Sequence, residues 1–152
     1  MPKHQLPAPF DCLKYKKRLG EYIGDLPHRG KGIQVTVGCE ADLDIFDALP
    51  TLQAVWKNRT KLFRVYRETV SNDQLFRINN FLVQTEPPLK ELTQKQFEKL
   101  LSTPSTIEIE ISNDKEIIRF CSYSDAFGEH GIQGWVNVEE LSISDAETYC
   151  LY

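Results

Sequence analysis

The chain has 152 residues, of which 41% are hydrophobic, 26% charged and 11% aromatic, which is the length and composition of one folded globular domain. These proportions exclude an intrinsically disordered chain and a collagen-like one. The net charge of −4 and the isoelectric point of about 5.4 argue against a protein whose main partner is a nucleic acid.

We expect no membrane or export signal in this sequence. No segment approaches the roughly 18 apolar residues that a membrane span needs. Residues 1–5 lead into Pro7 and Pro9 rather than into the apolar core of a signal peptide. We therefore expect a soluble, cytoplasmic protein without a membrane partner. Because prolines disfavour regular structure, we expect residues 1–18 to form an N-terminal arm and residues 19–152 to form a single domain.

Two short strands are predicted around a turn-rich segment near the start of the domain. Residues 19–27 precede the glycine-rich residues 28–32, and residues 33–37 then alternate apolar and polar side chains. This order is typical of a β-hairpin. The turn sequence Arg29-Gly30-Lys31-Gly32 offers amides and two cations to a phosphate, but no helix follows it as in a phosphate loop.

The longest helix is predicted over residues 47–71, with Asp44 or Asp47 as its cap. Its apolar side chains lie within an arc of about 100°, the width of a stripe that faces a core. These side chains are Leu49, Leu52, Trp56, Phe63, Tyr66 and Val70. Arg59 projects from the same arc, and the pattern does not decide whether it reaches the surface or pairs with a carboxylate.

Two further helical segments are predicted before the pattern changes. Residues 74–83 form a shorter amphipathic segment, which ends before Pro87-Pro88. Thr93 and Gln96 have the spacing of a capping box, which predicts a helix that begins there and stops at Pro104.

After Pro104 the apolar period becomes two residues, which indicates strands. Residues 106–112 alternate cleanly, residues 116–123 return after an Asn-Asp turn, and residues 132–138 follow as a third strand. The order of elements predicts an α+β fold, in which an antiparallel sheet consists of the N-terminal hairpin and a C-terminal meander. The helices should pack on one face of that sheet.

Charge is divided unevenly along the chain. Residues 1–99 carry 16 Lys and Arg against 12 Asp and Glu, whereas residues 100–152 carry 2 against 10. A segment this acidic cannot neutralise itself, so it either folds against the basic part or presents a negative field to solvent. The second possibility predicts a docking surface for a basic protein, formed by Glu108, Glu110, Asp125, Glu129, His130, Glu139, Glu140, Asp145 and Glu147.

Two other kinds of function remain open. His130 lies close in sequence to Asp125 and Glu129, which suits a small hydrolase or transferase, although the same glycine-rich loop also suits a simple chain reversal. Alternatively, Lys57, Lys61 and Arg64 share one helix face, which suits a regulatory module that binds an anionic partner.

The cysteines give no sign of a metal centre. Cys12, Cys39, Cys121 and Cys150 are far apart, with no C-x-x-C pair and no His at zinc-finger spacing. We expect reduced thiols, no metal and no cofactor.

The order of a Leu-Pro-bearing hairpin, a helical middle and a terminal meander with Glu129-His130-Gly131-Ile132 resembles small bacterial immunity domains. Such domains are associated with polymorphic-toxin loci and contact-dependent growth inhibition. The resemblance covers the layout of residues 20–140, and its specific part is that four-residue step between late strands. It implies a non-enzymatic protein that neutralises a cognate toxin by binding, and a nuclease toxin would suit an acidic inhibitor because its cleft must be cationic. Neither the toxin nor the oligomeric state follows from the residues.

Overall fold

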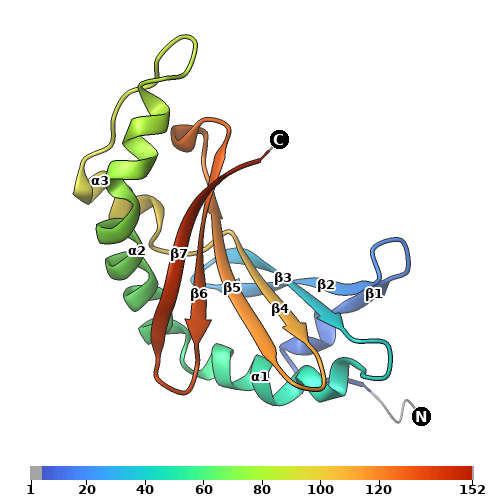
Figure 1. Ribbon diagram of the computed structural model, residues 1–152. Helices are drawn as coiled ribbons and strands as arrows, with labels where there is room; N and C mark the ends of the chain where they lie inside the picture. Colours follow the sequence, from blue (N-terminus) through green and yellow to red (C-terminus); the bar gives the residue numbers. More distant parts are fainter. Residues whose placement is uncertain (1–4, 152) are drawn as a thin grey trace.

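The computed structural model describes residues 5–151, which form a seven-stranded sheet with three helices (Figure 1). The strands are β1 (Lys14–Lys16), β2 (Glu21–His28), β3 (Lys31–Cys39), β4 (Thr106–Ile111), β5 (Glu116–Tyr123), β6 (His130–Asn137) and β7 (Ser142–Cys150). The helices are α1 (Ile45–Lys57), α2 (Arg59–Leu82) and α3 (Gln94–Leu100), with two short 3₁₀ turns at Phe10–Cys12 and Asp125–Phe127.

The spatial order of the strands is the same as their order in the chain. Every neighbouring pair is antiparallel except β3 and β4, which run parallel because the three helices connect them. The predicted α+β fold, with a largely antiparallel sheet built from a hairpin and a meander, is confirmed.

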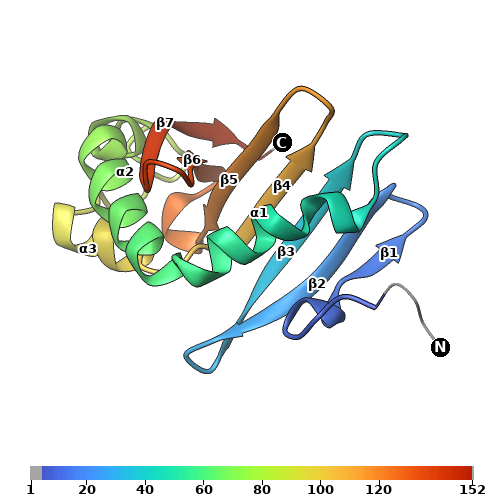
Figure 2. The ribbon, with the colours of Figure 1, turned by 90° about the horizontal axis from the view of Figure 1, so that it is seen from below.

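The helices cover one face of the sheet (Figures 1 and 2). α1 packs under β3 and β4, and α2 packs under β6 and β7. Their buried side chains meet the inward residues of the strands, including the isoleucines of β4 that the alternation predicts to share a face, Ile107, Ile109 and Ile111. The hydroxyl groups of Tyr66 and Ser122 lie 2.7 Å apart and form a hydrogen bond between α2 and β5 inside this core.

Local signals in the sequence account for several element boundaries. The Asp44 side chain accepts from Phe46 N, and the Asp47 side chain accepts from Asp44 N, so both predicted acids cap α1. Thr93 and Gln96 form the predicted capping box of α3. The β2–β3 turn consists of Arg29 and Gly30, whose positive φ angles of 50° and 79° match the twist of a two-residue hairpin.

The predicted helix over residues 47–71 is wrong in its boundaries, because two helices occupy this region. α1 ends at Lys57, Asn58 caps it, and α2 continues to Leu82 through the segment predicted as separate. The Asn58 side chain donates to Ala54 O at 2.8 Å, which closes α1, while Asn58 O accepts from Leu62 N and opens α2. The apolar arc itself is retained, since its members are buried or half-buried.

Arg59, which the sequence left undecided, lies at this junction between the helices. Its Nε donates to His28 Nδ1 at 3.1 Å and its Nη1 donates to Trp56 O at 2.7 Å. The guanidinium carbon lies 4.5 Å from the centre of the Trp56 ring, which is a cation–π distance. Arg59 therefore fastens the α1–α2 junction to the hairpin, and it forms no salt bridge with a carboxylate of residues 5–151.

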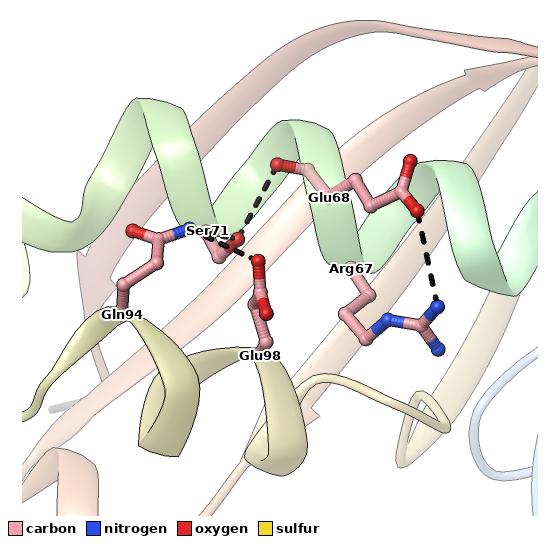
Figure 3. A network of polar contacts seen from close by, with 5 residues as sticks. All are labelled: Arg67, Glu68, Ser71, Gln94 and Glu98. Carbon is pink, nitrogen blue, oxygen red and sulfur yellow. Dashed lines mark hydrogen bonds and ion pairs between the residues drawn. The ribbon is translucent and has the colours of Figure 1, made fainter.

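A polar network joins α3 to α2 (Figure 3). Gln94 Nε2 lies 2.8 Å from Ser71 Oγ and 3.2 Å from Glu98 Oε1, and the hydroxyl of Ser71 donates to Glu68 O. Farther along α2, the Asn79 amide pairs with both backbone groups of Leu92. These contacts hold the start of α3 and the segment that precedes it against α2.

The expectation of an N-terminal arm needs correction for the described part of residues 1–18. Leu6, Phe10 and Leu13 are buried in the common core, with exposed fractions of 4–7%. β1 adds to the edge of the sheet by pairing with β2. Although prolines prevent a long regular element here, three large apolar side chains give the segment enough area to bury. Residues 1–4 lie outside the described part.

Two features of the sheet were not predicted. β7 has no clean alternation in the sequence, and it is nevertheless a nine-residue edge strand. Hydropathy patterns also cannot show that β3 and β4 are parallel neighbours. None of the helices between residues 5 and 151 has the length and apolar character that crossing a membrane requires.

Burial of Phe10 predicts a large loss of stability in Phe10→Ala. We expect the free energy of unfolding to fall by about 3 kcal/mol, because the substitution removes a buried ring and leaves a cavity. The exposed neighbour Asp11 serves as the control, and Asp11→Ala should change the free energy of unfolding by less than about 0.5 kcal/mol. Urea denaturation measures both, and equal effects would show that the segment does not stabilise the domain.

His28 predicts a specific dependence of stability on pH. Burial, and then the positive charges of Arg59 and Arg29, lower the pKa of His28 below its ordinary 6.5. The unfolded chain then binds a proton more readily than the folded one, so stability is lost as pH falls below about 6.5 toward the folded pKa. In His28→Asn, whose Oδ1 can still accept from Arg59, this loss should be absent. Melting curves of the two proteins between pH 7.5 and 5 test this, and parallel pH profiles would contradict it.

Candidate functional site

No helix or strand of residues 5–151 covers the sheet face opposite the helices, and we call it the open face. Side chains alternate along each strand, so the register places defined residues on this face. Its charged members are six carboxylates, one guanidinium and two ammonium groups: Glu21, Asp25, Glu108, Glu110, Asp145 and Glu147, with Arg119 and, on the edge strand β1, Lys14 and Lys16. None of these side chains is buried. The open face therefore carries a net negative charge, and its two lysines lie at the β1 edge.

Arg119 of β5 neutralises part of this charge. Its Nη2 lies 3.0 Å from Glu108 Oε1 and 3.4 Å from Glu110 Oε1. Both carboxylates were expected to be free for a partner, whereas the structure shows them sharing one cation of this chain. Glu21, Asp25, Asp145 and Glu147 form no salt bridge among the described residues, so net negative charge remains.

The middle of the open face is hollowed. A depression of about 390 Å³ lies in front of β2, β3 and β4, and Leu19, Glu21, Ile23, Thr36, Glu108 and Arg119 line it. Leu19 is 62% exposed at its rim. A protruding side chain of a partner could enter this hollow, where it would meet carboxylates beside an apolar wall.

Aromatic rings occupy the β5–β7 end of the open face. Trp135 pairs in register with Arg119 and Asp145, and Tyr123 and Tyr149 flank Gly131. The Tyr149 hydroxyl donates to the Tyr123 hydroxyl at 3.2 Å. A Cβ at Gly131 would lie 2.7 Å from the Tyr149 ring, so glycine lets this ring lie flat against β6.

The groups nearest this aromatic end are not prepared for chemistry at neutral pH. Burial first, and then the negative charge of Glu108, raises the pKa of the Cys121 thiol to about 11. Burial, followed by the hydrogen bond to Tyr123, also raises the pKa of Tyr149. Both groups keep their protons, which leaves neither a thiolate nor a phenolate to act as a nucleophile.

The structure distributes the eight acids predicted for partner binding over three places, and it places His130 apart from them. Glu108, Glu110, Asp145 and Glu147 lie on the open face. Glu139 and Glu140 lie in the β6–β7 turn, and Asp125 and Glu129 lie in the β5–β6 loop at the opposite end of β6 (Figure 1). The nine residues therefore do not form one continuous patch.

His130 is packed against the helix layer, away from these acids. Its ring stacks on Phe81 of α2 with centroids 4.3 Å apart and an interplanar angle of 19°. Its Nδ1 is buried without a hydrogen-bond partner. Neither Asp125 nor Glu129 orients the ring, as the catalytic alternative requires. Among the described residues, no three His, Cys, Asp or Glu side chains are arranged to hold a metal ion.

The β5–β6 loop instead reverses the chain. Ser124 Oγ accepts from Ala126 N, and the Asp125 carbonyl accepts from Gly128 N in the 3₁₀ turn. Gly128 has a φ of 64°, which suits glycine at the point of reversal.

Sequence reasoning missed several members of the open face. A charge count by segment does not identify Glu21 and Asp25, because they lie in the basic part of the chain. Both nevertheless lie on the open-face side of β2. Trp135, Tyr123 and Tyr149 join them only through the strand register. The alternation of side chains within each predicted strand could have assigned these residues to the open face.

Comparisons of the chain with protein-family models, with curated proteins and with solved structures gave no match.

The geometry around Arg119 predicts unequal roles for its two carboxylate partners. Glu108 is closer and 30% exposed, whereas Glu110 is 55% exposed. Glu108→Gln should lower the free energy of unfolding by about 1 kcal/mol and Glu110→Gln by less than about 0.5 kcal/mol, since water screens the more exposed pair. Urea denaturation at low and high salt tests this. The difference should shrink at high salt, and a larger effect of Glu110→Gln would contradict it.

Proposed function

We propose that this chain is a protein-binding inhibitor that captures a basic protein on its open face. The observation that carries the proposal is the face itself: six carboxylates outnumber Arg119, Lys14 and Lys16 on a sheet surface that none of the described helices covers. Clustered negative charge accelerates encounter with a positive partner and disfavours acidic competitors.

The aromatic end of the face can supply binding energy through buried apolar area, which charge alone does not provide. Trp and Tyr side chains dominate binding energy in many protein interfaces, because they bury large areas at a small entropic cost. Trp135, Tyr123 and Tyr149 lie beside Asp145 and Glu147 in register. We infer a contact in which the acids steer the approach and the rings hold the bound partner.

The partner class follows from this charge and from the resemblance to immunity domains. A toxin with nuclease activity needs a cationic cleft for phosphates, and an acidic face can occupy such a cleft competitively. The step Glu129-His130-Gly131-Ile132, which carries the resemblance, lies at the start of β6. Under the same proposal the protein acts in the cytoplasm, because an immunity protein must meet the toxin inside the cell that it protects.

Charge reversal on the open face provides the test. Asp145→Lys combined with Glu147→Lys should lower the association rate constant for the toxin encoded beside this gene by at least about tenfold at low ionic strength. It should also weaken protection when the two proteins are co-expressed. The wild-type association should itself slow as salt is raised.

The matched control changes the same charge elsewhere. Glu139→Lys combined with Glu140→Lys reverses two acids in the adjacent turn, outside the open face, and should alter association by no more than about threefold. Equal slowing by both double variants would place the contact outside the open face. Absence of a complex at low salt, together with undiminished toxicity, would end the inhibitor proposal.

A further inference from the structure

A second polar hollow lies where the β2–β3 turn, α2 and the α3–β4 loop meet. Its volume is about 310 Å³, and it is separate from the open face. The polar side chains at its wall include three arginines and three hydroxyls: Arg29, Arg64, Arg67, Thr60, Ser102 and Thr103. Arg29 and Arg64 belong to two basic segments that are far apart in the sequence, and the fold brings them together.

The three guanidiniums have little compensation from this chain. The salt bridge of Arg67 is with Glu68, its sequence neighbour, at 4.0 Å, and Figure 3 shows this contact on the surface of α2. Arg29 and Arg64 form no salt bridge among residues 5–151, and no described Asp or Glu lines the hollow. Convergence of like charges raises the free energy of the empty site, and a bound anion would lower it.

His28 adds a donor at the same wall. The guanidinium of Arg59 can only donate, so His28 Nδ1, 3.1 Å from Arg59 Nε, must be the acceptor. In the neutral ring the proton then resides on Nε2, which can donate to a ligand. Burial, and then the charges of Arg59 and Arg29, lower the pKa of His28, which favours this neutral form. All the polar side chains at the wall can therefore donate hydrogen bonds.

We propose that this hollow binds the phosphate group of a small phosphate monoester. Phosphate presents several acceptor oxygens and up to two negative charges to a cluster of guanidinium forks and hydroxyls, which is the geometry that arginine recognises well. The volume is at the lower end of small-molecule sites. A nucleic acid fits less well, because it needs an extended basic track on a chain whose net charge is −4.

Calorimetric titration of the full chain with ribose 5-phosphate, inorganic phosphate and ribose tests the assignment. We expect saturable one-to-one binding of ribose 5-phosphate and no binding of ribose. Comparable affinity for inorganic phosphate would identify free phosphate as the ligand, and weaker affinity would identify the ester; either result supports the site. Arg29→Gln combined with Arg64→Gln should lower the association constant at least about tenfold.

Lys31→Gln combined with Lys61→Gln is the matched control. It removes two cations from the same hairpin and the same helix, at positions that do not line the hollow, and should change affinity by less than about threefold. Circular dichroism and melting temperature establish that both double variants are folded.

Three results would overturn the proposal. The first is no saturable binding of either phosphate up to about 10 mM, which corresponds to a negligible affinity. The second is an equal loss in both double variants, which would indicate diffuse electrostatic attraction. The third is much tighter binding of a single-stranded oligonucleotide with a steep salt dependence, which would indicate a nucleic-acid surface.

Discussion

The parallel pairing of β3 with β4 is the constraint on which the rest of this structure depends. Each of the other five ladders joins strands that a short turn or loop connects, whereas the connection between β3 and β4 spans residues 40–105. All three helices belong to that connection, and they lie together on one face. A single crossover can cover a single face, which leaves the opposite face of all seven strands in contact with solvent.

The same constraint determines where charge can lie. The covered face takes the apolar residues of each strand, since there they bury area against α1 and α2. Polar residues of the same strands are then left on the other side, and acidic residues of β2, β4 and β7 meet there although they are distant in sequence. Most of the basic side chains lie instead on the helices and the hairpin turn. The acids of the open face therefore come from both the basic and the acidic part of the chain.

The fold could be predicted from the sequence where the signal is local. The alternation of residues 106–112, the capping box at Thr93 and the turn at Arg29-Gly30 depend on neighbours within a few positions. The break at Asn58 was missed because the apolar residues before and after it fall within one arc when they are plotted on a single helical wheel. The prediction of an N-terminal arm was wrong because it considered only the prolines of this segment and not its large apolar side chains, such as Phe10, which are buried.

The candidate site was less accessible to such reasoning. Counting charges identified the acidic C-terminal third, but the count could not distinguish Asp145 on the open face from Glu140 in a turn. It also could not show that Arg119 lies between Glu108 and Glu110. The hollow between Arg29 and Arg64 depends on tertiary packing alone, since the two segments approach only when α2 lies beside the hairpin turn.

The β3–β4 ladder also has a consequence for assembly of the chain. Its formation closes a loop over residues 40–105, whereas the other ladders close short turns, so it carries the largest loop-closure entropy in the sheet. Glu21 and Asp25 lie on one side of the β3–β4 ladder, and Glu108 and Glu110 lie on the other. A chain in which both hairpin regions have formed but β3 and β4 have not yet paired therefore lacks the complete acidic surface. Recognition through that surface would select molecules that have finished folding.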